Sequence, residues 1–316
     1  MLKYFPFAPA FDLKMGTASL APDYPVVEID ENYRDEILLK RKLLLQDHAY
    51  YYKAAPLTTA AQWEVVEKVL TGLSLSHPEI FHFTKVNSRA SWVNKLLDEK
   101  LDFVFGDPAS LPLEPLDWVG RQVQEDLLLL DAASMLQAGQ LCFPSGWDIQ
   151  AKFQKHFLDL HAPVPSLMGA TLRAAHKLIE RIPAHKPIAR TNWGFRITDQ
   201  MDFSSRHTAQ YLKLLEQQAD DITHENAGDK IFVRSERQTL SRLPASGFVL
   251  FTIHTYNSKI KDECQDMDRA KAMMSFLKTV PTELLEYKLV TTFVGKLIRY
   301  LEGFDSDPRR RLIHSP

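Results

Sequence analysis

The residue with the clearest chemical potential is a histidine in the stretch 142–165, CFPSGWDIQAKFQKHFLDLHAPVP. Asp148 suits a helix N-cap, and apolar side chains then recur at spacings of three and four, which predicts one apolar helix face. These side chains are Ile149, Phe153, Phe157 and Leu160. His161 follows Phe157 by four residues and continues this face, and the prolines at 163 and 165 forbid further helix. The spacing therefore predicts an imidazole at a helix end that points toward the core.

Such an imidazole suits a metal or haem ligand. The carbonyl groups of the last helical turn have no partner within the helix, and one of them can accept a hydrogen bond from Nδ1–H. That bond would fix the tautomer of His161 and leave Nε2 as an electron-rich donor. A histidine that only caps the helix or satisfies a core carbonyl would show the same spacing. The residues alone leave both interpretations open.

A second group of candidates lies in VRSERQTLSRLP, residues 233–244. On a strand, Arg234 and Glu236 share one face and Arg237 takes the other. Arginine recognises carboxylates and phosphates with two parallel hydrogen bonds, so a cofactor-anchoring role is possible. Surface arginines paired with Glu236 are the alternative. Arg190 and Asn192, in RTNW, enter another predicted strand, where they would line a pocket or satisfy backbone groups.

Two adjacent acids, Glu125 and Asp126, lead into the apolar run 127–130. A carboxylate beside such a run is often partly desolvated, which raises its pKa and fits it to bind an amine or to relay protons. An acidic turn that starts a strand fits the pattern equally well. His254 lies on the clearest predicted strand, 248–256, in which Phe251 and Ile253 face the other way.

The elements that would position these residues form an α+β pattern. Residues 1–27 are predicted to be an extended arm anchored by Phe5, Phe7 and Phe11. The rest of a helical N-terminal region, 1–104, is predicted to hold helices over 31–54, around 63–73 and over 90–100. A core region, 105–260, follows, and the C-terminal region, 261–316, is predicted to hold helices over 262–278 and 281–302. The predicted strands are 126–131, 140–143, 189–198, 230–239 and 248–256, all within a single domain.

Composition excludes several classes of protein. The formal net charge of −2 over 316 residues implies no general polyanion-binding surface, so no nucleic-acid partner is expected and the arginine run 309–311 is predicted to be a solvated end. Two cysteines are too few for a disulfide framework or a thiolate cluster, and no CxxCH string attaches haem covalently. No stretch reaches membrane-spanning length, and the first residues do not read as a signal peptide. A cytoplasmic protein is expected.

Several strings, taken in order along most of the chain, resemble one family, the haem-dependent oxidative N-demethylase α-subunit-like proteins. They are FPFAPAFDLKMG, VEIDENYRDEILLKRKLLL, VQEDLLLL, FPSGWD, LHAPVP, RTNW and RSERQTLSRLPASGFVLFTIHTY. The pairs FPSGW with HAPVP, and ERQTLSRLP with FTIHTY, are the most specific. Two positions depart from the family pattern: Thr17 stands in the family's MGL string, and His254 stands where many relatives have arginine.

The resemblance implies a PAS-like antiparallel sheet of about five strands with flanking helices, holding a non-covalent b-type haem. It also implies a haem-dependent monooxygenase that removes a methyl group from a small secondary amine, such as dimethylamine, with O2 and releases formaldehyde. Electrons would come from NADPH through separate FMN and iron–sulfur subunits, since this chain has no GxGxxG string and only two cysteines. A haem-binding sensor or carrier without turnover is the alternative, and a haem-free scaffold is a third reading.

Roles for individual residues follow as hypotheses within this picture. His161 is the predicted axial ligand of the iron. Asp126 or Glu125 is predicted to hold the ammonium form of the amine or to relay protons. Apolar strand residues such as Phe251 and Ile253 would exclude water. The remaining predicted haem contacts are Arg190, Asn192, Arg234 and Arg237, of which the arginines would pair with propionates.

Overall fold

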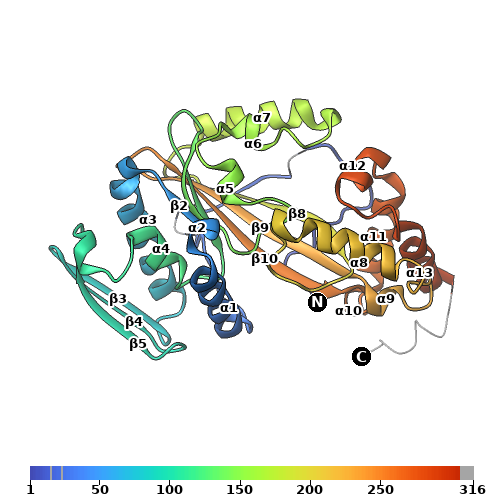
Figure 1. Ribbon diagram of the computed structural model, residues 1–316, viewed down its shortest axis with the longest axis horizontal. Helices are drawn as coiled ribbons and strands as arrows, with labels where there is room; N and C mark the ends of the chain where they lie inside the picture. The colour runs from blue at the N-terminus through green and yellow to red at the C-terminus, as the bar shows by residue number, and fades with distance from the viewer. Residues whose placement is uncertain (15, 23, 307–316) are drawn as a thin grey trace.

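A seven-stranded antiparallel sheet runs through the centre of the molecule, in the order β1-β8-β9-β10-β6-β7-β2 (Figure 1). The structure is a computed structural model that describes all residues except 15, 23 and 307–316, so the predicted arginine end at 309–311 lies outside the described residues. The strands are β1 Ala18–Ser19, β2 Tyr52–Ala54, β6 Asp126–Leu130, β7 Leu136–Gln140, β8 Ile188–Arg196, β9 Phe232–Arg242 and β10 Val249–Lys259. The predicted α+β class is confirmed. The central sheet has seven strands instead of the expected five, with the short strands β1 and β2 at its edges, and the expected PAS-like five-strand arrangement is not confirmed.

A second sheet of three strands corrects the sequence-based expectation for the N-terminal region. The strands are β3 Phe81–Val86, β4 Arg89–Asn94 and β5 Glu99–Val104. The stretch 90–100, predicted as a helix, forms most of β4 and the start of β5. Asn87 and Asp98 adopt positive φ angles of 57° and 54°, and both residue types favour such turns. Residues 1–104 are therefore not purely helical.

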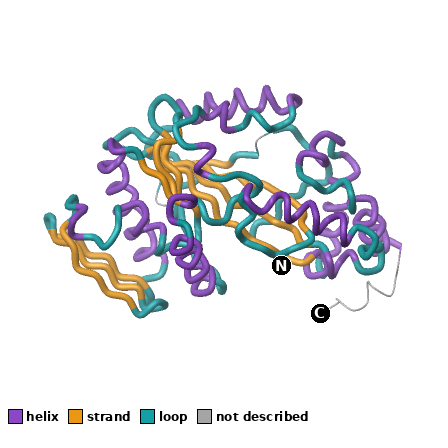
Figure 2. Tube along the Cα trace, in the orientation of Figure 1, coloured by secondary structure: helices purple, strands orange, loops and turns teal. Residues whose placement is uncertain are grey.

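The helices gather at three places around the central sheet (Figures 1 and 2). Near the second sheet lie α1 Tyr33–Gln46, α2 His48–Tyr51, α3 Thr59–Ser76 and α4 Pro115–Gly120. Over one face of the central sheet lie α5 Ile149–Lys152, α6 Phe157–Leu160 and α7 Gly169–Arg181. At the far end lie α8 Thr208–Gln218, α9 Ala227–Lys230, α10 Ile260–Glu263, α11 Met267–Thr279, α12 Thr282–Tyr287 and α13 Val294–Ser306.

The predicted continuous helix that leads to His161 is broken in the middle. Gln154 has a φ of 57°, outside the helical region. The backbone explains the break, because Gln154 N donates to Leu136 O at 2.8 Å and Leu136 N donates to Lys155 O at 3.0 Å. Residues 154–155 thus pair with β7, and two helices of one turn each, α5 and α6, replace the longer one.

A related correction applies to the predicted strand 140–143. Its last residues leave the sheet because the backbone N–H groups of Cys142 and Phe143 donate to the carboxylate of Asp126, at 2.7 and 2.9 Å. β7 consequently ends at Gln140.

The two faces of the central sheet differ in what covers them. On the face here called the α7 face, Phe251 and Ile253 of β10 belong to an apolar cluster with Phe157 of α6. On the opposite face, here called the arm face, Thr252 donates to Val26 O at 3.0 Å. Residues 25–28 also contact this second face. The predicted anchoring of the arm is confirmed, because Phe7 is buried in an apolar cluster against which Phe5 and Phe11 pack. Strand alternation on β10, as predicted, assigns each side chain to one of these environments.

Candidate functional site

An incompletely covered apolar surface lies on the α7 face. Phe251 is only half-buried although it lies between β6 and β9, opposite Leu128 and Leu240. α7, which lies above the strands in Figure 1, carries apolar side chains at spacings of three and four, yet only Ile179 of this helix is buried. The others on that helix face are Leu172, Ala175 and Leu178. Protein interiors are close-packed, so this surface is suited to a flat apolar ligand.

His161 lies beside this surface, at the residue that follows α6. Its Nδ1 is 2.8 Å from the carbonyl oxygen of Phe157, and a carbonyl only accepts, so Nδ1 carries the proton and Nε2 keeps its lone pair. This confirms the predicted bond. Burial lowers the pKa of His161, and the positive charges of Arg190 and Lys152 lower it further, although the Phe157 carbonyl opposes this. The neutral imidazole, which is the ligating form, is favoured.

Polar side chains on neighbouring strands continue the α7 face toward the sheet edge. Arg190 and Asn192 of β8 lie directly opposite Gln238 and Glu236 of β9. Arg190 donates to Gln238 Oε1 at 3.0 Å, and Asn192 donates to Glu236 Oε2 at 3.1 Å. Gln238 also donates to Glu236 Oε2, at 2.8 Å. Because Arg190 affects the pKa of His161, the structure brings the predicted ligand, Arg190 and Asn192 into one region.

Lys288, which follows α12, is a member of this region that the sequence did not reveal. Its Nζ donates to Trp193 O at 2.6 Å and lies 3.5 Å from Asn192 Oδ1. Burial lowers the pKa of Lys288 to about 7, helped by Arg196 and Arg190 and opposed by Glu236. The residue stands in a loop between two helices, almost a hundred residues from its contacts in β8, so no local motif indicates it.

Arg234 shares the α7 face, but its guanidinium is occupied by the protein itself. It donates to Ser145 Oγ and to the carbonyl oxygens of Phe143, Pro144, Gln200 and Met201. These bonds join the FPSG loop to the loop after β8. Since Arg234 is buried and its donors are used, it positions these loops in the structure.

Asp126 also lies on the α7 face, because its direct strand partner is Ile253. Its carboxylate is fully buried and accepts the two backbone N–H groups of Cys142 and Phe143. Burial raises the pKa of Asp126 to about 6, against the opposing effects of Lys40, these two hydrogen bonds and Arg234. The carboxyl group is thus able to hold a proton close to neutral pH.

Glu125 and Arg237 lie on the arm face, away from His161. Glu125 Oε1 accepts from the backbone N–H of Glu28 and from His254 Nδ1, both at 2.9 Å. Arg237 is directly opposite His254 and donates to Pro25 O at 3.1 Å. The structure therefore separates these two predicted site residues from the rest, and it confirms that Arg237 and Arg234 take opposite faces.

His254 belongs to the same arm-face cluster. Burial lowers its pKa, but the carboxylates of Glu125 and Asp30 outweigh burial and raise the pKa to about 10. The imidazolium is therefore the form that occupies the arm face. It does not reach the α7 face, where His161 lies.

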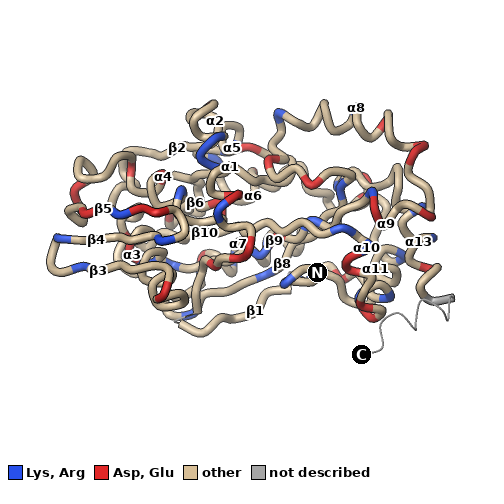
Figure 3. Tube along the Cα trace, turned by 90° about the horizontal axis from the view of Figure 1, so that it is seen from below, with Lys and Arg blue, Asp and Glu red and all other residues tan. Residues whose placement is uncertain are grey.

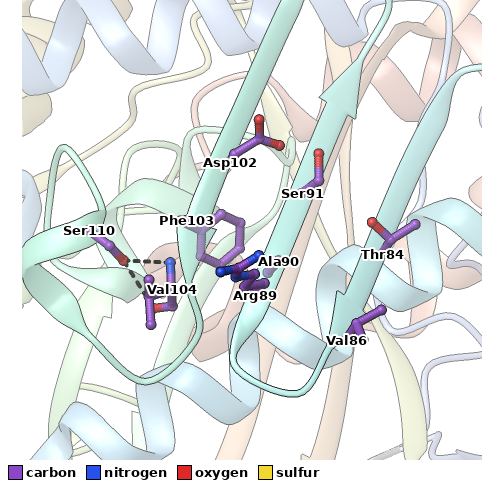
Figure 4. A pocket seen from close by; sticks show the side chains of 9 residues that line it. All are labelled: Thr84, Val86, Arg89, Ala90, Ser91, Asp102, Phe103, Val104 and Ser110. Carbon is purple, nitrogen blue, oxygen red and sulfur yellow. Dashed lines mark hydrogen bonds between the residues drawn. The ribbon is translucent and has the colours of Figure 1, made fainter.

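A cavity of about 510 Å³ lies elsewhere, on the three-stranded sheet (Figure 4). Its walls include Thr84, Arg89, Phe103 and Val104. Among the described residues, no three histidine, cysteine or carboxylate side chains are grouped to hold a metal ion. No helix in the described part of the chain is long and apolar enough to cross a membrane. Along the backbone trace of Figure 3, the positions of lysine and arginine residues are interspersed with those of acidic residues.

Comparison with known families shows a match over most of the chain. The family described as "Haem-dependent oxidative N-demethylase, alpha subunit-like" matches residues 18–298, which is most of the chain and includes every element from β1 through the first residues of α13. The match covers the α7 face, the arm face and the three-stranded sheet alike.

Proposed function

Because the chain belongs to the haem-dependent oxidative N-demethylase, alpha subunit-like family, we propose that it binds a b-type haem on the α7 face and demethylates a small secondary amine. The observation that carries this proposal is the hydrogen bond from His161 Nδ1 to Phe157 O, which leaves Nε2 ready to ligate iron. We assign His161 as the axial ligand. Dimethylamine is the substrate we propose, in line with the resemblance described above.

The residues present on the α7 face fit a haem. A half-buried Phe251 and the incompletely buried apolar side of α7 supply surfaces for a flat, mostly apolar ring. Arg190 lies near His161 and supplies a positive charge for a propionate. His161 thus offers a ligand for the iron, Phe251 and α7 offer an apolar surface for the ring, and Arg190 offers a positive charge for a propionate.

The bound haem would supply the activation of oxygen. The overall reaction converts the N-methyl amine, O2, two electrons and two protons into an N-hydroxymethyl amine and water; the N-hydroxymethyl amine then splits into the demethylated amine and formaldehyde. The chain itself orients and shields the reactants. Phe251 and Ile253 exclude water, and Asp126 holds a proton on the same face, helped by its raised pKa. Glu125 is assigned no part, since it faces His254 across the sheet.

Partner subunits must deliver the electrons in this scheme. We propose NADPH as the source, with FMN and iron–sulfur subunits as carriers. The family description includes the words "alpha subunit", which supports an assembly with other chains. The sequence has only two cysteines, Cys142 and Cys264, both buried, whereas an iron–sulfur cluster usually takes four cysteine ligands, which supports placing such a centre on another subunit.

The first test is an absorption spectrum of the protein expressed with haem supply, before and after dithionite. We expect a strong Soret band that shifts on reduction and about one haem per chain. His161→Ala should lose this haem because the imidazole is removed. His185→Ala is the control, since His185 is exposed and should retain the wild-type spectrum.

Three outcomes decide between the readings. An unchanged haem content and spectrum in His161→Ala would remove the ligand assignment. A wild-type protein that stays colourless and also refuses added haemin would remove the cofactor. A haem protein that receives electrons but forms no formaldehyde from dimethylamine would favour the sensor or carrier over the enzyme.

A further inference from the structure

The edge of the α7 face holds more positive than negative charge. The positive charges of Arg196 and Arg190 lower the pKa of Lys288, whereas the carboxylate of Glu236, in the same region, raises it. Glu236 is already engaged, because it accepts from Asn192 and Gln238 and interacts with Arg234. Positive charges outnumber this carboxylate in a half-buried setting, where desolvated cations are costly, and a bound anion would lower that cost.

Lys288 is the cation with a donor to spare. An ammonium group has three N–H donors. Among the described residues, its partners are the neutral oxygens Trp193 O, at 2.6 Å, and Asn192 Oδ1, at 3.5 Å. The Nζ atom also lies 4.3 Å from the centre of the Trp193 ring. Two of the three donors are thus directed at neutral acceptors. Apart from the Trp193 ring, no acceptor among the described residues takes the third, so it is available to a ligand.

Arg196 provides a second, independent indication that an anion can bind here. The residue is buried, with 7 % of its surface exposed. Its Nη1 donates to Phe195 O and to Lys288 O, at 2.8 and 3.0 Å, so it fixes the backbone of Lys288. Its Nε has no hydrogen-bond partner. A buried guanidinium donor without a partner is uncommon. This one belongs to the residue that bonds the backbone of Lys288.

We propose that Lys288, flanked by Arg190 and Arg196 and supported by Asn192, forms a carboxylate-binding site at the β8 edge of the α7 face. A carboxylate is favoured because it accepts hydrogen bonds from ammonium and guanidinium groups together. It has two possible sources, a haem propionate or a free small carboxylate. The propionate source rests on the proposed function, whereas the free source does not. Arg234 is not needed, since its guanidinium group bonds the protein's own carbonyls, and Arg237 lies on the arm face, away from Lys288.

Such a site must couple carboxylate binding to proton uptake. Without the ligand, the pKa of Lys288 is about 7 because burial and the two arginines disfavour the ammonium form. A carboxylate beside Nζ stabilises the ammonium form and raises this pKa. The free site therefore loses its proton as the pH rises above 7 while the occupied site keeps it. Affinity for the carboxylate should fall with rising pH.

The charged and titratable groups that face Lys288 leave it as the titrating group. Arg190 and Arg196 on β8 stay positive, and Glu236 on β9 has a lowered pKa: burial would raise it, but Arg234 and the hydrogen bonds to Glu236 outweigh that effect. Tyr287, the neighbour in α12, has a raised pKa because of burial and Glu236, so it stays neutral. Between pH 7 and 9, Lys288 is therefore the group at this edge that changes its protonation state.

The test compares haemin with haemin dimethyl ester, whose propionates are blocked, in absorbance titrations from pH 6 to 9. For wild type, haemin affinity relative to the ester should fall above pH 7, by up to about tenfold per pH unit. Lys288→Met should lower haemin affinity by about 10- to 100-fold and leave ester affinity unchanged. Lys288→Arg should keep haemin bound and abolish the pH dependence, since arginine stays charged. Lys186→Met, at an exposed lysine, is the control.

A calorimetric titration with propanoate at pH 6.5 tests the free source on the same variants. Propanoate binding to wild type that is lost in Lys288→Met supports the site even if no haem binds, in which case only the proposed function fails. Equal losses for haemin and its ester in Lys288→Met would show a merely structural lysine and overturn the proposal. Wild-type protein that prefers haemin no more than the ester and binds no propanoate would also overturn it.

Discussion

Four of the ionisable side chains with displaced pKa values show how burial and neighbouring charges act near the sheet. Burial lowers the pKa of Lys288 to about 7 and raises that of Asp126 to about 6. Burial also raises the pKa of Glu36, to about 7. His254 is the exception, since burial lowers its pKa but Glu125 and Asp30 outweigh burial and raise it to about 10. Burial thus sets the direction of the pKa shift at three of these side chains, and neighbouring charges set it at His254.

Glu36 gives a pH-dependent stability with a definite sign. Its pKa rises from 4.5 to about 7, chiefly by burial, so the folded state favours the protonated acid. This contribution to stability is complete below pH 4.5 and is lost as the pH rises through 7. Glu36→Gln keeps an oxygen that accepts from Gln124 but carries no charge. The variant should therefore be more stable than wild type at pH 8.5, by up to about 3 kcal/mol.

Urea unfolding of both proteins at pH 4.5 and pH 8.5 checks this expectation. The difference in unfolding free energy should be near zero at the lower pH and grow toward the higher one. Glu31→Gln is the control, because Glu31 is exposed in the turn before α1. A difference that does not change with pH would show that Glu36 ionises normally in the fold.

At the scale of elements, local patterns predicted well wherever they agreed with long-range pairing. The alternation along β10 correctly divided its side chains between two faces, and the carbonyl bond of His161 was anticipated from its place after a helix. The helix over 149–161 failed because residues 154–155 pair with β7, a contact that no spacing shows. The predicted helix over 90–100 is wrong because Ala90, Trp92 and Asn94 alternate as the buried side chains of β4.

The attachment of α7 depends on one arginine from the sheet. Arg242, at the end of β9, donates to Ile179 O, Glu180 O and Ile182 O, at 2.7, 3.0 and 2.7 Å. These are carbonyls in or just after the last turn of the helix, which have no partner within it. Arg242 also donates to Gly247 O at 2.7 Å, so it joins the helix end to the β9–β10 turn.

Removal of this attachment should loosen α7 without unfolding the sheet. Hydrogen bonds from a charged donor contribute about 1.5–3 kcal/mol each, so Arg242→Met should speed amide hydrogen exchange in α7 by at least about tenfold. Exchange in β9 and β10 should change much less. Arg181→Met is the matched control, since Arg181 is exposed at the end of the same helix. Equal acceleration in α7 and β10 would mean that Arg242 supports the whole fold instead.

At the scale of the whole molecule, the two faces decide which predicted residues meet. Residues adjacent in sequence, such as Glu125 and Asp126, end on opposite sides of one sheet, and so do Arg237 and Glu236. The sequence could predict this alternation but not which face would carry His161, because that depends on where the broken helix returns. The sequence could not predict Lys288 as a site residue for the same reason, since only the folded chain brings its loop to β8.

The N-terminal arm joins separate parts of the core on the arm face. Phe7 is buried in one apolar cluster, with ring centroids 5.2 Å from Phe195 and 5.1 Å from Phe276. Further along, Val26 and Val27 are buried in another cluster, below the three-stranded sheet. The arm thus ties the end of the molecule with α11 to the end with α3.

Phe7→Ala tests how much this connection contributes. Truncation of a buried phenylalanine removes its apolar contacts and leaves a cavity, which costs about 3–5 kcal/mol. Leu13→Ala is the control, because Leu13 lies on the same arm with 42 % of its surface exposed, and its loss should cost less than about 0.5 kcal/mol. Both are measured by urea unfolding with fluorescence and circular dichroism. If the arm joins the two clusters, Phe7→Ala should lower the urea midpoint seen by fluorescence and the midpoint seen by circular dichroism by the same amount. A small change like that of Leu13→Ala would show that the sheet alone holds the clusters together.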